Sequence, residues 1–506
     1  MLRDLHFPGS KLKNEAQGTD PGIRIADANI KQLFPEGLVY SSPARGTWTI
    51  AHTSMLIPGS HQIFVCPSCC LRGVVLSAEE MGAMERFSML EFTDEHILKG
   101  DLESMIIEGV TEILLEMEKK PTCVLLYTSC VQHFLNIDLS LVYRESAARF
   151  PDIDFIDCYM LPTMRKHFTP EKMQWRQLYR AVQPLPVNEK AVNFIGSYYA
   201  IDADCELYDL LGVREDMETA GADRDSGKAA SIAAPLNVAS RKAASIAAPL
   251  NTALGKDCFI VRQLPTLERY EEYKYMGEAL ANIYFNPVIK FAADDMEKRL
   301  GQKGIYLPAL YDFREIERCE RLLTEELGRP IPDDARAWFD TLRYEAEDAL
   351  LKAKMAVGIR EIAIDGAAVT RPLSLAKMLF KQGFRVTRVY ADAFLPEETE
   401  DFRWLAIHAP EIRIYPMTDS RMRRADRKPE GPGFVAIGQK ATYFTGTRHF
   451  VNLVENGGLY GFRGIRRLAE LIEDAAKLEK DPGKLIQIKA LGCTENCARL
   501  SAVKTP

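Results

Sequence analysis

Three cysteines, Cys66, Cys69 and Cys70, lie within five residues in the segment "VCPSCCLRG". Cys66 follows a short apolar run, so we expect it at the end of a strand or in the loop after it. Pro67 and Ser68 favour a turn at this point. Such a turn can direct two or three sulfur atoms toward one place, which is the arrangement that a thiolate-bound metal requires.

A fourth cysteine, Cys130, ends the apolar run "VLLYTSC". If both segments are strands of one parallel sheet, their carboxyl ends share one edge, where ligands collect. The thiols of Cys70 and Cys130 can then meet in space although 60 residues separate them in the chain.

Thiolates in threes or fours suit zinc or an iron–sulfur cluster. Zinc knuckles pair one Cys-x-x-Cys with a second close pair, whereas the second element here is a single distant cysteine. An iron–sulfur cluster fits better, because clusters accept scattered ligands and take some from another chain. The alternative is that these cysteines are buried and unreactive, since free cysteine is among the most buried residue types. We favour that alternative for a scattered cysteine such as Cys319.

The composition excludes several classes of function. The chain has 506 residues, 47% apolar and 27% charged, and its formal net charge of -7 argues against a general nucleic-acid binder. The sequence contains no run of 18 apolar residues, so no membrane span is predicted, and its first residues lack the apolar region of a signal peptide. We therefore expect a cytoplasmic protein. In a reducing compartment its eleven cysteines are expected to be thiols or metal ligands rather than disulfides.

The elements that must position these thiols alternate between short apolar strands and longer amphipathic helices, which predicts α/β units with parallel sheets. A helix over 101–120 precedes the strand 123–130. Further strands are expected at 153–160, 191–198 and 257–264.

The segment 360–394 has the pattern strand, loop, helix, strand. Pro372 stands where a first helical turn tolerates it, and Gly383 stands at the expected helix end. The runs "EIRIYPM" and "GFVAIGQ" continue the alternation, and a final amphipathic helix is expected over 465–480.

We therefore expect an α/β fold of three Rossmann-like domains with parallel sheets flanked by helices. The expected parts are an N-terminal arm (1–45), a cluster-binding domain (46–190), a second domain (191–345), a third domain (346–482) and a C-terminal tail (483–506). Within the second domain, the Ala-rich stretch 219–256 holds "KAASIAAPLN" twice and is expected to be a surface insertion without chemistry.

At these residues the chain resembles component 1 of nitrogenase and its relatives, among them the dark-operative protochlorophyllide and chlorophyllide reductases, cofactor-assembly scaffolds and other nitrogenase-like reductases. The family's turn ending in cysteine is similar to "VCPSCC", with Pro67 in place and Cys70 at a cluster-ligand position. "EFTDEHILKGDLESMIIEGV" is similar to the segment between the ligands, and "YTSCVQHFLNIDLS" places Cys130 at the second ligand. The resemblance extends over roughly 46–480 and includes "FIGSY" and the order of the third unit.

This resemblance implies an oxidoreductase subunit of nitrogenase component 1 architecture. It implies an iron–sulfur cluster, either [4Fe–4S] or larger and P-cluster-like, held by Cys66 or Cys69 together with Cys70 and Cys130 at the interface with a sister component 1 chain, in a homo- or hetero-oligomer. Low-potential electrons would come from a separate ATP-dependent iron–sulfur reductase protein. No Gly-x4-Gly-Lys-Ser/Thr loop occurs in this chain, so ATP coupling must come from that partner.

The chain also departs from the family. Relatives often carry an earlier cluster cysteine, but "SSPARGTWTIAHTS" has none, so Cys66, Cys69 or a partner chain must supply that ligand. The cysteine that holds the nitrogenase α-chain cofactor has no counterpart in 283–301, and only His449 lies near the place of its histidine. The chain thus looks like a β-type partner or a nitrogenase-like reductase subunit. A non-enzymatic scaffold for cluster assembly and a structural partner chain are the alternatives.

Other polar residues are weaker candidates. His133 could donate a proton or contact a partner, with a solvated loop histidine as the alternative, and His52 and His61 flank the cysteine turn. Cys493 and Cys497 would share a helix face and could help to bind a metal.

Three residues at strand ends have possible supporting roles. Thr128 and Ser129 carry hydroxyls that could donate to a cluster sulfur. Asp365 ends a strand, where ligands often bind, but a simple strand-to-helix turn is the simpler interpretation.

Overall fold

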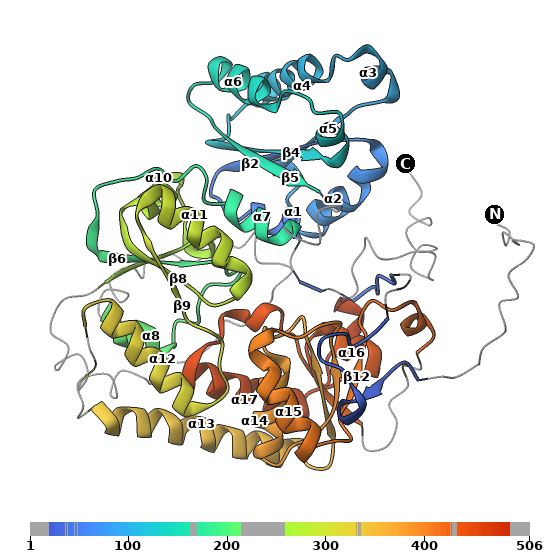
Figure 1. The fold of residues 1–506 in the computed structure, drawn as a ribbon, viewed down its shortest axis with the longest axis vertical. Coiled ribbons are helices and arrows are strands. Elements are labelled where there is room, and N and C mark those ends of the chain that lie inside the picture. The colour runs from blue at the N-terminus through green and yellow to red at the C-terminus, as the bar shows by residue number, and fades with distance from the viewer. Residues whose placement is uncertain are drawn as a thin grey trace, which may run out of the picture.

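The structure is a computed structural model. It describes residues 20–485 except 36, 38, 45, 48, 162–168, 214–258, 330, 332–334, 426 and 428–432. The strands of the described residues form three sheets, each with helices against it (Figure 1). All strand pairs within these sheets are parallel except the pair of the short strand β1 with β12.

The first sheet carries the clustered cysteines and has the strand order β3-β2-β4-β5. Its strands are β2 (Ser60–Cys66), β3 (Phe87–Glu91), β4 (Cys123–Ser129) and β5 (Asp154–Met160). The helices of this part are α1 (Ile50–Ser54), α2 (Ser68–Glu80), α3 (Asp94–Lys99), α4 (Leu102–Glu116), α5 (Cys130–Phe134), α6 (Leu139–Arg149) and α7 (Pro170–Gln177). In Figure 1, α4 and α6 lie on one side of the sheet and α1, α2 and α7 on the other.

Alternation of side chains along the central strands explains this layering. Phe64 and Tyr127 point to the face covered by α2 and α7, where their rings stack with centroids 4.2 Å apart. Val65 and Leu126 point to the opposite face and pack against α4 and α6. Both faces are apolar, as expected for a parallel sheet that helices cover on both sides.

The second sheet has the order β7-β6-β8-β9. Its strands are β6 (Asn188–Ile195), β7 (Ile260–Gln263), β8 (Ala279–Tyr284) and β9 (Lys303–Tyr306). The helices of this part are α8 (Glu206–Leu210), α10 (Tyr270–Lys274), α11 (Lys290–Leu300) and α12 (Phe313–Glu326). The Ala-rich stretch 219–256 lies outside the described residues.

The third sheet has the order β1-β12-β11-β10-β13-β14. Its strands are β1 (Ile23–Arg24), β10 (Glu361–Asp365), β11 (Arg385–Tyr390), β12 (Arg413–Tyr415), β13 (Phe434–Ile437) and β14 (Phe450–Val451). The helices of this part are α13 (Arg336–Val357), α14 (Pro372–Lys381), α15 (Thr399–His408), α16 (Gln439–Thr445) and α17 (Gly461–Lys477). Residues of the expected N-terminal arm thus add an edge strand to the third sheet.

The fold class predicted from the sequence, α/β units with parallel sheets flanked by helices, is confirmed. Pro372 is the first residue of α14, and Gly383 follows the end of that helix with a φ of 79°. The expected final helix is α17, which begins four residues earlier than predicted, at Gly461. The domain boundaries themselves stay a prediction.

One continuous hydrophobic core joins the second and third sheets, and the long helices α13 and α17 pack against each other within it. The first sheet joins the second through a separate core in which α7 meets α11. No helix among the described residues is long and apolar enough to cross a membrane.

Candidate functional site

The first cysteine group lies where a strand passes directly into a helix. Cys66 is the last residue of β2, Pro67 is extended at φ -61° and ψ 152°, and α2 begins at Ser68. Cys69 and Cys70 therefore lie in the first turn of a helix, and the prediction of a separate turn at Pro67 and Ser68 is wrong.

The sequence after the cysteines explains why a helix forms there. Leu71, Val74 and Ala78 follow at helical spacing and are buried against the first sheet. Pro67 lacks a backbone N–H and has a fixed φ, which suits the position just before a helix.

The second cysteine lies at an equivalent junction. Ser129 is the last residue of β4 and the N-cap of the short helix α5, which begins at Cys130. Strands β2 and β4 are parallel neighbours whose last pair is Val65 with Thr128. Both junctions therefore lie at the carboxyl edge of the same sheet, as the sequence predicted.

The thiols at this edge differ in burial. Cys69 is exposed, while Cys70 and Cys130 are half-buried. The Sγ atoms of Cys69 and Cys70 are 3.8 Å apart. Burial raises the pKa of the Cys70 thiol, and its hydrogen bond to Cys69 and the charges of Cys69 and Cys130 raise it further.

Cys66 differs from the other three thiols because it lies in the hydrophobic core, together with buried residues of α2. It is fully buried, and burial, followed by the charges of Cys70, Cys69 and Glu91, raises the pKa of its thiol to about 12. Without a bound cation this thiol stays protonated at neutral pH. A bound metal would reverse that preference, because a coordinating thiol is deprotonated.

These thiols do not surround a single metal ion. Within the described part of the chain, no group of three or more histidine, cysteine, aspartate or glutamate side chains is arranged to hold one ion. A cluster makes a different demand, because its cysteines bind different irons and their sulfurs lie farther apart than around one metal. Cys70 and Cys130 follow neighbouring parallel strands at one sheet edge, with the exposed Cys69 beside Cys70, and this placement fits part of such a ligand set.

The hydroxyls beside Cys130 have partners other than sulfur. Thr128 Oγ1 lies 3.1 Å from His133 Nε2 and donates to the Cys158 carbonyl at 3.4 Å. Ser129 Oγ donates to Gln132 Oε1 at 2.5 Å. These bonds fix the two residues that precede Cys130.

His133 is a packed side chain rather than a solvated loop residue. It is half-buried, its ring centroid lies 5.3 Å from that of Tyr159, and burial lowers its pKa. His133 thus lies in a helix and not in the expected loop, and its partly exposed ring supports the β4–α5 junction through Thr128.

The two histidines near the first junction have structural partners. The Nδ1 atom of buried His52 lies 2.7 Å from Thr49 Oγ1, in a capping arrangement at the start of α1. The Nε2 atom of His61 lies 2.8 Å from Ser88 Oγ, and burial followed by the charge of Arg86 lowers the His61 pKa to about 4. His61 is therefore neutral at physiological pH.

The remaining candidates lie away from the cysteines. Buried Asp365 accepts backbone hydrogen bonds from Ala367 at 2.8 Å and Lys440 at 2.7 Å, as expected for a strand-to-helix turn. His449 Nδ1 lies 2.9 Å from the Ala475 carbonyl oxygen of α17, so this ring joins a loop to a helix. The predicted pair of Cys493 and Cys497 lies outside the described residues.

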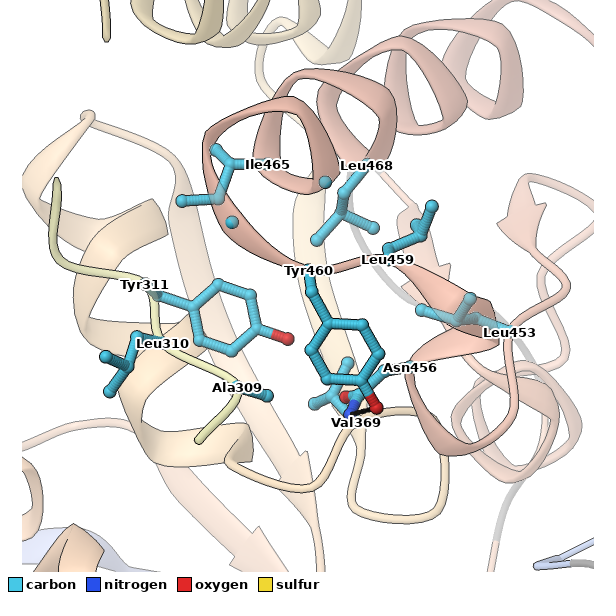
Figure 2. Close-up of a pocket in the computed structure, with 12 residues that line it drawn as sticks. Ala309, Leu310, Tyr311, Val369, Leu453, Asn456, Leu459, Tyr460, Ile465 and Leu468 are labelled. Carbon is cyan, nitrogen blue, oxygen red and sulfur yellow. Dashed lines mark hydrogen bonds between the residues drawn. The ribbon is translucent and has the colours of Figure 1, made fainter. Parts of the chain in front are cut away.

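A small cavity lies between the second and third sheets (Figure 2). Tyr311, which precedes α12, and Tyr460, which precedes α17, line it together with Asn456 and apolar side chains. Its volume of about 10 Å³ is at the lower limit for one water molecule. It has no room for a substrate or a large cofactor in this conformation.

Sequence reasoning missed Gln132, whose buried amide bonds to both cysteine-bearing segments. A signal was present: "SCVQ" has the Ser-x-x-Gln pattern of a capping box, which predicts a helix start at Cys130. The pattern does not reveal the second bond of Gln132, which reaches the neighbouring strand.

Comparison with known proteins agrees with this architecture. The family described as nitrogenase component 1 type oxidoreductase matches residues 52–477. A solved structure described as nitrogenase Cp1 at pH 6.5 has 14% sequence identity and a TM-score of 0.57, with 88% of this chain and 95% of that chain covered. Another, described as nitrogenase Cp1 at pH 5, has 11% identity and a TM-score of 0.52, with 90% and 93% covered. At these identities the likeness shows the fold alone. No curated protein matches the chain.

Proposed function

Because the chain belongs to the nitrogenase component 1 family, we propose that it is a nitrogenase-like oxidoreductase subunit that holds an iron–sulfur cluster at the seam with a sister chain. The observation that carries this proposal is the position of Cys70 and Cys130 at one sheet edge, at two neighbouring strand-to-helix junctions. The cluster is of the [4Fe–4S] or the larger P-cluster-like class.

Cys70 and Cys130 are the central ligands in this proposal. Cys69 adds an exposed thiol beside them, and Cys66 adds a buried one that becomes a ligand if metal binding deprotonates it. If Cys66 stays protonated, or if the cluster is the larger P-cluster-like one, a partner chain must supply further ligands, which agrees with a cluster shared between chains.

Exposed apolar side chains beside Cys130 support a covering partner. Phe134, the last residue of α5, is 74% exposed, and Leu135, which follows it, is 46% exposed. Apolar side chains that stay exposed next to a functional group often mark an interaction surface. The partner proposed here is the sister component 1 chain.

When bound, the cluster supplies low-potential electron transfer. The protein adjusts the potential through burial and through hydrogen bonds to the sulfurs. Cys69 and Cys70 lie in the first turn of α2, where backbone N–H groups that have no partner within the helix could donate hydrogen bonds to cluster sulfurs. A separate ATP-dependent iron–sulfur reductase protein delivers the electrons in this proposal, and the complex is cytoplasmic.

The test is anaerobic purification of the full chain with its sister chain, followed by iron quantification and electron paramagnetic resonance. Cys130→Ala should lose most of the bound iron and the cluster signal. Cys319→Ala, a half-buried cysteine of α12 far along the chain, is the matched control and should keep both. Equal iron in the wild-type and Cys130→Ala proteins would overturn the proposal.

A cluster-assembly scaffold is the second candidate. It is favoured by the lack of a cysteine in 283–301, where the family resemblance places the ligand of the catalytic cofactor. Electron consumption during turnover with the reductase partner supports the oxidoreductase. Transfer of the cluster to an acceptor protein, without turnover, supports the scaffold.

A further inference from the structure

One buried side chain joins the two cysteine-bearing junctions. Gln132 lies on α5 and is 0% exposed. Its Oε1 atom accepts hydrogen bonds from the Ser129 backbone N–H at 2.9 Å and from the Ser129 hydroxyl at 2.5 Å. Its Nε2 atom donates to the Val65 carbonyl oxygen at 2.7 Å.

The partners of Gln132 are the residues next to the cysteines. Ser129 directly precedes Cys130, and Val65 directly precedes Cys66. The ladder between β2 and β4 ends at the pair Val65 and Thr128. Gln132 therefore adds a hydrogen-bonded link between β2 and β4 at the point where their backbone pairing stops and the polypeptide after each strand becomes helical.

A capping role alone does not explain this arrangement. The capping box of α5 needs only the bonds between Gln132 and Ser129. The bond to Val65 spans 67 residues of sequence and belongs to no helix cap. It also requires an amide, because the same side chain must accept from an N–H and donate to a carbonyl, and a carboxylate only accepts.

We propose that Gln132 is a positioning residue for the iron–sulfur site, which fixes the Cys130 junction relative to the strand that leads to Cys66 and Cys70. This inference rests on the proposed function. Residues that orient metal ligands without touching the metal typically change metal affinity by about 10- to 100-fold when mutated. We expect Gln132→Met to weaken iron binding by about 10-fold or more.

The matched control is Gln62, a glutamine on β2 that is also 0% exposed and donates one bond, from Nε2 to the Ala51 carbonyl at 3.0 Å. Gln62→Met removes a buried amide from the same sheet, four residues before Cys66. It should lower the thermal midpoint by less than Gln132→Met, because one hydrogen bond rather than three is lost, and it should keep the iron and its resonance signal. Gln132→Glu keeps the bonds to Ser129 and loses the donor to Val65, so it should also lose iron.

Iron content and electron paramagnetic resonance are measured on anaerobically reconstituted full chains with the sister chain. A second readout uses the metal-free chain with Cys69→Ser in every variant, because the Cys69 thiol 3.8 Å from Cys70 would compete for the reagent. It measures dibromobimane cross-linking of Cys70 to Cys130, with the joined peptides identified by mass spectrometry. We expect this cross-link to slow several-fold in Gln132→Met and to keep the wild-type rate in Gln62→Met.

Three results would overturn the inference: wild-type iron in Gln132→Met or in Gln132→Glu, equal iron loss in Gln62→Met, or an unchanged cross-linking rate in Gln132→Met. If the wild-type chain itself binds no iron, the proposed function fails. The cross-linking result then still decides whether Gln132 positions the two cysteines.

Discussion

Arg463, in the first turn of α17, is predicted to contribute strongly to the stability of the fold. Arg463 is 3% exposed, and its guanidinium pairs with Asp209, which is 0% exposed, and donates to the Asp204 carbonyl at 3.1 Å. Glu206, also 0% exposed, accepts the backbone N–H of Arg463 at 3.1 Å. The buried guanidinium of Arg463, on a helix of the third sheet, thus compensates the negative charge of Asp209 on α8, a helix of the second sheet.

Arg463→Met removes the guanidinium and keeps much of the side-chain volume. Removing one partner of a buried ion pair leaves an uncompensated buried charge and typically costs about 3–5 kcal/mol. We expect a loss of stability of that size for Arg463→Met. The backbone hydrogen bond to Glu206 survives the change, so the loss reports on the side chain.

Arg467→Met on the same helix is the control. Arg467 pairs with Glu470 at 2.9 Å, and its side chain is 29% exposed. Partly exposed pairs of this kind contribute about 0–1 kcal/mol. The assay is urea denaturation of the metal-free chains followed by circular dichroism and tryptophan fluorescence. A loss for Arg463→Met no larger than that for Arg467→Met would refute the reasoning.

Two further predictions concern the same buried region. Burial and the charge of Glu206 hold the pKa of the Glu320 carboxyl well above its usual range. The proton of Glu320 therefore stabilises the folded chain fully below a pH of about 4.3, and this stabilisation is lost as the pH rises through the raised pKa. Glu320→Gln keeps a hydrogen-bond donor toward Glu206 but cannot titrate. It should make the fall in the free energy of unfolding with rising pH less steep by up to about 1.4 kcal/mol per pH unit. Parallel wild-type and mutant profiles of denaturation midpoint against pH would contradict this. Gly461 has a φ of 71°, and an added Cβ would collide with Glu206 Oε1. Gly461→Ala should therefore lower the thermal midpoint well below that of Gly301→Ala, because Gly301 has a similar φ of 73° but open space around it. Equal midpoints would show that φ alone sets the effect.

Hydrophobic periodicity predicted the sheets well, because strands that are buried on both faces read as short apolar runs. The strand 123–130 and the helix 101–120 appear as β4 and α4 with shifts of a few residues at their ends. The edge strand β1 has only two residues, and its pairing with β12 depends on a contact almost 400 residues away in the chain. No local pattern encodes such a contact.

The cysteine edge was predicted only in part. The sequence predicts that Cys70 and Cys130 share one sheet edge, and the parallel pairing of β2 with β4 confirms it. The different burial of Cys66 and Cys69 depends on how α2 packs, which the spacing of the cysteines does not determine. Gln132 was missed because the bond to Val65 joins segments that only the folded sheet brings together.

The measurement that tests the central claim most directly is anomalous diffraction at the iron edge, on crystals of the anaerobically purified complex with the sister chain. The account predicts one iron–sulfur cluster at the carboxyl edge of the first sheet, with the sulfurs of Cys70 and Cys130 both bonded to its irons. An iron site to which neither sulfur is bonded would contradict the account.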